Sequence, residues 1–209
     1  MTETTREVEN NVREAIQSGD DIYQQVRDIT LKALTERELD MENIKSVIQS
    51  VSKGINTGLT AQYGPAREAF KQSTDALDDA LASTAEASKL AIEEAASRVS
   101  EFSQHDLNKA TEDLKSLEGL FLDTMSEITQ ESNEVVFEIA QDFLSHARNS
   151  GTAVGRQTQT ILDAMNDMRH IGQDVIVSGT VATTATLAKI ASGFLSGIAE
   201  SLQPDKPTK

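Results

Sequence analysis

Apolar residues recur along this chain at the spacing of one helix face, and polar residues fill the positions between them. From residue 110 to residue 147 the intervals are four, three and four residues, repeated without interruption. The positions are Ala110, Leu114, Leu117, Phe121, Met125, Ile128, Ser132, Val136, Ile139, Phe143 and Ala147. Eleven residues over three turns is close to the natural twist of a straight helix, so the pattern predicts a long helix with one apolar stripe.

The segments on either side repeat the eleven-residue interval. The segment 65–104 carries Phe70, Leu81 and Ile92 at this interval. The segment 152–201 carries Val154, Met165, Ile176, Leu187 and Ile198. Helix-breaking residues near Gly64-Pro65, His105-Asp106 and Asn149-Thr152 separate the segments.

These patterns predict an all-α fold: an elongated bundle of three long antiparallel helices with eleven-residue apolar periodicity, preceded by two or three short helices. Ser18-Asp21 ends the first short helix, and Asp40 is the expected N-cap of another. We expect a short-helix region at 1–64, the bundle at 65–203 and a disordered tail at 204–209. One continuous bent rod is the alternative arrangement of the long helices.

Composition narrows the classes of function. The 209 residues include no cysteine and no tryptophan, and the formal net charge is -15. A disulfide framework and a cysteine-bound metal are therefore excluded, and an acidic surface argues against binding to a nucleic-acid backbone. The polar, acidic start of the chain lacks the features of a secretory signal, so we expect a cytoplasmic protein.

The charge is unevenly distributed. Residues 65–150 hold 18 acidic and 7 basic side chains, a net charge of -11, whereas residues 151–209 hold five of each. From 175 to 199 the one ionisable residue is Lys189, and Gly193 and Gly197 have the spacing that allows close helix packing. This stretch is interpreted as a buried or oligomer-forming helix, with surface association or a membrane span as alternatives.

Candidate catalytic chemistry is sparse. Each of the three histidines, His105, His146 and His170, has an acidic residue on its helix face, but the Glu-x-x-His spacing of di-iron bundles is absent. The Gly151-Gly155 stretch lacks the lysine of a phosphate-binding loop, and no Gly-x-Ser-x-Gly occurs. We therefore predict no enzymatic activity, no cofactor, no metal site and no small-molecule substrate.

Two resemblances follow from particular stretches. Residues 26–54, which run from Val26-Arg-Asp-Ile to Val-Ser-Lys-Gly54, resemble an uncharacterised all-helical family of proteobacterial proteins. Residues 66–200, with long Ala/Ser/Thr-rich helices and few aromatic residues, more loosely resemble phasins. The second resemblance implies an amphipathic coat protein of bacterial polyhydroxyalkanoate granules.

Three hypotheses result. A phasin-like protein would lay its stripes on a hydrophobic granule or lipid surface, whereas an oligomeric scaffold would keep them in a protein core and bind protein partners. A membrane protein would be anchored through 175–199. Both of the first two hypotheses use the same contact residues, and we expect a homo-oligomer. These residues are Leu117, Phe121, Ile128, Val136, Ile139, Phe143, Ile176, Leu187, Phe194 and Ile198, with Gly193 and Gly197 at a close helix contact.

Overall fold

The computed structural model of the chain describes residues 3–60, 66–97, 104–130, 132–169 and 184–201. Within these ranges all regular structure is helical, which confirms the all-α prediction. The eight helices of these ranges are α1 (Glu3–Ser18), α2 (Ile22–Thr35), α3 (Met41–Thr60), α4 (Ala66–Ser97), α5 (Gln104–Thr129), α6 (Glu134–Ser150), α7 (Ala153–Arg169) and α8 (Thr184–Ser201).

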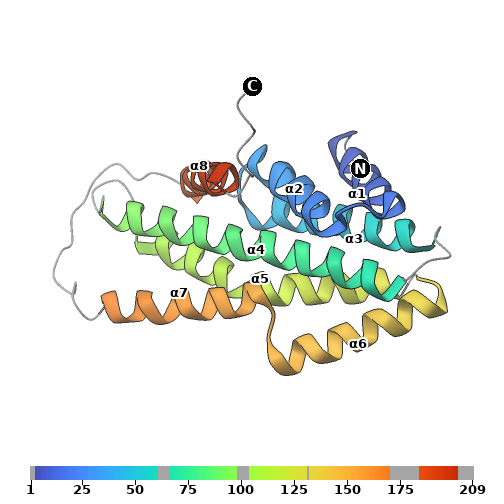
Figure 1. Cartoon of the computed structure of the whole chain (residues 1–209). Helices are drawn as coiled ribbons and strands as arrows, with labels where there is room; N and C mark the ends of the chain where they lie inside the picture. Colours follow the sequence, from blue (N-terminus) through green and yellow to red (C-terminus); the bar gives the residue numbers. More distant parts are fainter. Residues whose placement is uncertain (1–2, 61–65, 98–103, 131, 170–183, 202–209) are drawn as a thin grey trace.

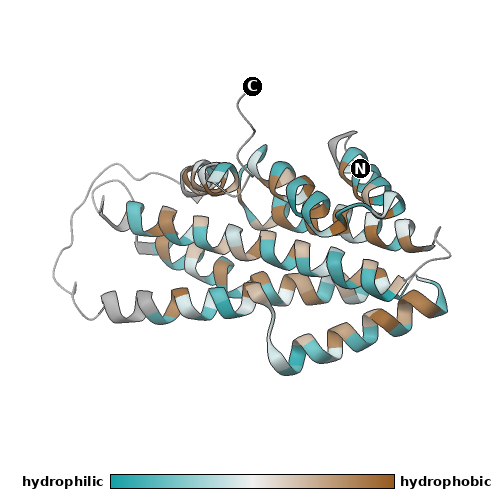
Figure 2. Ribbon diagram, viewed as in Figure 1, coloured by the Kyte–Doolittle hydropathy of each residue, from teal (hydrophilic) through white to brown (hydrophobic). Residues whose placement is uncertain are grey.

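An antiparallel pair formed by α4 and α5 runs through the middle of the molecule (Figure 1). The three N-terminal helices and α8 cover one side of this pair, and α6 and α7 follow one another along the other side. Hydrophobic and hydrophilic residues are interspersed along the helices (Figure 2), as expected for amphipathic helices. The arrangement is therefore a layered bundle built on one long helical hairpin.

Local signals set several helix boundaries as expected. The Asp40 Oδ1 atom accepts a hydrogen bond from the Asn43 backbone N–H at 2.8 Å, which confirms Asp40 as the N-cap of α3. The first helix ends at Ser18, and Gly19 follows it with a φ of 72°. After the C-terminal end of α6, Gly151 has a φ of 76°, a backbone conformation that favours glycine.

The prediction of three uninterrupted long helices is not confirmed. The segment predicted as one helix over 106–149 is divided into α5 and α6, because Asn133 starts a new helix. Its Oδ1 atom accepts a hydrogen bond from the Val136 N–H at 3.0 Å, and its backbone is extended. The described part of the segment 152–201 contains the helices α7 and α8, which pack on different sides of α4.

One contiguous cluster of buried apolar side chains extends through the bundle, from Val8 and Val12 in α1 to Leu195 in α8. In the described part of the chain, α1, α2 and α3 precede α4, and their buried residues belong to the same cluster as those of α4–α8. Seven of the eleven buried apolar positions of α4 are alanines, which allow neighbouring helices to approach closely. The division of the chain at residue 64 stays a prediction.

Candidate functional site

The predicted contact stripe of α5 and α6 lies inside the bundle. Of the six predicted contact residues in these two helices, five are buried: Leu117, Phe121, Ile128, Val136 and Ile139. Phe143 is half-buried, and its ring makes edge-to-face contacts with Phe70 of α4 and Phe121 of α5, at centroid distances of 5.9 and 6.2 Å. The stripe is therefore occupied by the chain's own side chains, and aromatic contacts of this geometry add to the free energy of burial.

The predicted contact residues of the last segment are less uniform. Phe194 and Ile198 of α8 are half-buried and pack against the core cluster. Ile176 lies outside the described residues, as does the side chain of Leu187. The residue of α8 that is fully buried is Leu195, because α8 turns the face containing Ala188, Ala191 and Leu195 toward the bundle.

Among the described residues, no neighbouring helix packs closely against Gly193 or Gly197. Both are exposed, and a Cβ atom added at either position would meet no described atom within 4 Å. Close packing occurs instead at Gly54 and Gly58 of α3, which lie against α1. An added Cβ atom at Gly54 would lie 2.6 Å from the Glu9 carbonyl oxygen.

Polar contacts attach α8 to the loop between α2 and α3. The Ser192 hydroxyl donates to the carbonyl oxygens of Thr35 and Arg37, at 3.2 and 2.8 Å. The Leu39 N–H donates to the carbonyl of Ala188 at 3.3 Å, a contact that crosses from the loop to α8. Lys189, the isolated charge of the predicted stretch, pairs with Glu38 at 3.3 Å.

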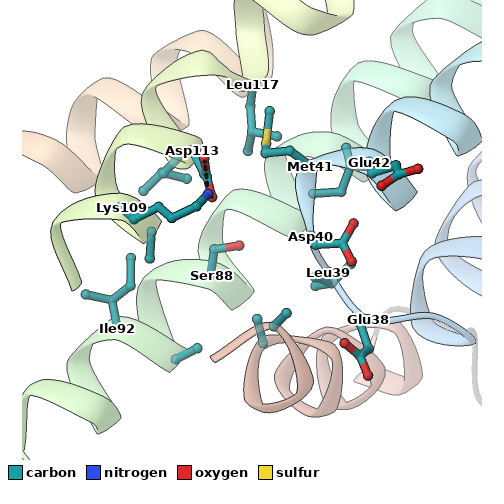
Figure 3. A pocket seen from close by; sticks show the side chains of 16 residues that line it. Glu38, Leu39, Asp40, Met41, Glu42, Ser88, Ile92, Lys109, Asp113 and Leu117 are labelled. Atoms are coloured by element: carbon teal, nitrogen blue, oxygen red, sulfur yellow. Dashed lines mark hydrogen bonds and ion pairs between the residues drawn. The ribbon is translucent and has the colours of Figure 1, made fainter. Parts of the chain in front are cut away.

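A pocket of about 380 Å³ lies where this loop, α4, α5 and α8 meet (Figure 3). Its floor is apolar, with Ile92 from α4 and Leu114 and Leu117 from α5. Met41 extends from the start of α3 toward Leu117 in Figure 3. Four carboxylates and one ammonium group also line the pocket: Glu38, Asp40, Glu42, Asp113 and Lys109. No local sequence pattern indicated this pocket, because its walls come from four separate segments.

The start of α7 is held by two carboxylates from other helices. Asp78 of α4 accepts the backbone N–H groups of Ala153 and Val154 at 2.6 and 2.9 Å. Glu118 of α5 accepts the N–H and the hydroxyl of Thr152 at 3.0 and 2.8 Å. Burial raises the pKa of the Asp78 carboxyl above its ordinary value, and the two N–H bonds oppose that rise. These carboxylates serve as helix caps, since the N–H groups at the helix start occupy their oxygens.

The described members of the histidine–acid pairs lie on the surface. Asp142 pairs with Arg67 at 3.1 Å, and its helix-face neighbour His146 is exposed. In the described ranges, no group of three or more His, Cys, Asp or Glu side chains could hold a metal ion. His170 lies outside those ranges.

Sequence reasoning missed two exposed apolar side chains at the start of α6. Val135 is 59% exposed and Phe137 is 38% exposed, on either side of the buried Val136. The stripe pattern accounts for Val136 alone, so it does not predict where the side chains of Val135 and Phe137 lie. Among the described residues, no helix combines the length and the apolar character that crossing a bilayer requires. Residues 175–183 of the predicted 175–199 span lie outside this description.

Comparisons with curated proteins and with solved structures gave no match. One protein-family model does match, and it covers residues 2–204. This range contains the stretch 26–54, whose resemblance to an uncharacterised helical family is thus extended to nearly the whole chain. The phasin resemblance stays a prediction. The chain belongs to a family of unknown function, DUF6781.

Proposed function

We propose that the protein is a non-enzymatic, oligomeric helical scaffold of the cytoplasm that binds protein partners through the outer faces of a closed bundle. The observation that supports this proposal best is the burial of the α5–α6 stripe against the chain's own helices. Phe121, at its centre, is completely buried. A surface-coating protein would need the same stripe to be available in its free form.

The size of the burial term favours the closed form in water. Burying one large apolar side chain contributes about 2 kcal/mol, so exposing Leu117, Phe121, Val136 and Ile139 together would cost about 8 kcal/mol. This is comparable with the whole net stability of a typical domain. The bundle therefore opens rarely unless a hydrophobic surface covers the stripe at the same time.

Light scattering and urea unfolding test the scaffold proposal. We expect a defined stoichiometry and one cooperative loss of helix, because the stripe links α4, α5 and α6 in one core. Phe121→Asp should abolish cooperative unfolding, since it places an unpaired charge in an apolar core. Glu127→Asp, on the exposed side of α5, should leave the transition unchanged. A monomer that loses helix gradually would refute the scaffold.

The phasin-like alternative gives a distinct result in the same preparation. Protein mixed with polymer granules or liposomes is floated on a density gradient at low and high salt. The scaffold proposal requires the protein to stay in the soluble fraction at both salt concentrations. Flotation at both would favour surface association, because burial of an apolar stripe depends little on ionic strength.

A further inference from the structure

The pocket beneath α8 combines room for a small organic molecule with an apolar floor. Its volume of about 380 Å³ is more than twice the roughly 150 Å³ of a protein cavity that takes up benzene. Ile92, Leu114 and Leu117 supply large apolar surfaces, while Ala188 and Ala191 of α8 leave space. The pocket lies at the lower end of the range for ligand sites, so it fits a compact ligand.

The charged groups that line the pocket are mostly acidic, and Lys109, which supplies the ammonium group among the described lining residues, is already paired. Lys109 contacts both carboxylate oxygens of Asp113, at 3.0 and 3.4 Å (Figure 3). Glu38 is paired with Lys189, and Asp40 caps α3. Glu42 has no ion-pair partner in the described part of the chain. The rim therefore repels anions and attracts cations.

We propose that this pocket binds a small amphipathic cation, a hydrocarbon chain or ring of about six to ten carbons that carries an ammonium group. The hydrocarbon part lies on the floor against Met41, Ile92 and Leu117, and the ammonium group lies at the rim near Glu42 and Asp40. An anionic amphiphile of equal length would meet no unpaired ammonium group among the described residues of the rim, because Lys109 and Lys189 are both paired. A neutral one gains the apolar contacts alone.

The test is a titration of the full-length protein with octylammonium, octanol and octanoate, which share one chain length and differ in head-group charge. Binding is followed by NMR through ¹³C-labelled methionine methyl groups. Met41 lines the pocket, whereas the buried Met125 contacts Ser52 through its sulfur and serves as an internal control for the fold. We expect the Met41 signal to shift saturably with octylammonium, while Met125 stays unchanged.

Head-group selectivity decides the ligand class. Octylammonium should bind about fivefold more tightly than octanol, and octanoate should be weakest. Its advantage over octanol should shrink as salt is added, because the rim carboxylates are partly solvent-exposed. Equal binding of the three amphiphiles, preference for octanoate, or no shift of Met41 with octylammonium would each overturn the proposal.

Matched variants locate the site. Ser88→Leu fills the pocket, and the loss of room for about two methylene groups should weaken octylammonium binding about tenfold. Ser83→Leu is its control, since Ser83 lies on α4 outside the pocket and, like Ser88, bonds only within its own helix. Glu42→Gln should weaken binding about two- to fivefold, and Glu112→Gln, on the exposed side of α5, should not. Equal effects within either pair would contradict the assigned site.

Discussion

Two helices of this bundle each carry a pair of glycines four residues apart, and the two pairs have opposite surroundings. In α3, Gly54 and Gly58 are buried against α1. Added Cβ atoms would lie 2.7 Å from the Val12 Cβ atom and 3.0 Å from the Ile16 Cβ atom, respectively. In α8, Gly193 and Gly197 are exposed, with nothing described within 4 Å of an added Cβ.

The difference follows from what the two helices have to bury. The only apolar stripe of α1 consists of Val8, Val12 and Ile16, and these β-branched side chains reach the core only if α1 lies close to α3. Glycines in α3 permit that approach. By contrast, α8 buries the opposite face, through Ala188 and Leu195. Glycine spacing therefore permits close packing, but the apolar face of the neighbouring helix determines whether it occurs.

The largest expected effect is at Gly54. Gly54→Ala should lower the free energy of unfolding by about 2 kcal/mol, because the clash with Glu9 and Val12 outweighs the better helix propensity of alanine. Gly58→Ala should cost less, since its nearest contact, the Ile16 Cβ atom at 3.0 Å, is less tight and needs a shift of only a few tenths of an ångström. Urea unfolding followed by circular dichroism measures both. A Gly54→Ala protein as stable as the parent would mean that α1 is not packed as described.

A third glycine tests an intermediate case, in which the neighbour is a flexible side chain. An added Cβ at Gly155 would lie 2.2 Å from the Glu118 carboxyl, so Gly155→Ala should displace that carboxyl from the start of α7. We expect a loss of about 1 kcal/mol, the value of a typical helix cap. The same substitution in a Glu118→Ala background should cost nothing. Additive losses in the double variant would show that Glu118 keeps its cap when Gly155 is replaced.

The helical fold and its apolar faces could be predicted from the sequence because they depend on local composition and spacing. The buried positions Leu117, Phe121 and Val136 all lie on the predicted stripe. The sequence does contain a signal for the division between α5 and α6, since Ser132 is the one polar member of the stripe and Asn133, a residue that favours helix starts, follows it. Periodicity outweighed this signal because the stripe continues in register across the break.

The contacts between distant segments could not be predicted in the same way. The pocket needs α8 to dock on the loop at 37–39, and Ser192 and Lys189 make that contact with Arg37 and Glu38, about 150 positions away in the sequence. No spacing within one segment encodes such a contact. The same limitation explains why close packing was predicted at Gly193 and Gly197 and not at Gly54 and Gly58.

A smaller and opposite effect is expected in α8. Gly193→Ala and Gly197→Ala should each raise the free energy of unfolding by roughly 0.5–1 kcal/mol, because alanine favours the helix and its Cβ atom meets no described atom within 4 Å. Light scattering on the same variants tests whether the exposed face of α8 that carries Gly193 and Gly197 is a contact between copies of the chain. Unchanged stoichiometry would place the contact elsewhere, whereas dissociation would show that the glycines pack between copies.

The smallest effect is expected from a single polar contact between α2 and α4. The Tyr23 hydroxyl of α2 donates to Asp79 of α4, and burial together with this bond raises the pKa of Tyr23 to about 12. Because this folded-state value exceeds the ordinary value of 10.0, the contact stabilises the protein below pH 10 and is lost as the pH rises toward 12.

Ultraviolet absorbance of the phenolate measures this pKa directly. The chain has two tyrosines, so Tyr63→Phe leaves Tyr23 as the only phenol. We expect a midpoint near 12, falling toward 10 with Asp79→Asn but staying above it, because burial remains when the charge is removed. Circular dichroism over the same pH range controls for unfolding. A midpoint near 10 in the folded Tyr63→Phe protein would show that the Tyr23 hydroxyl is neither buried nor bonded to Asp79, and would contradict this contact between α2 and α4.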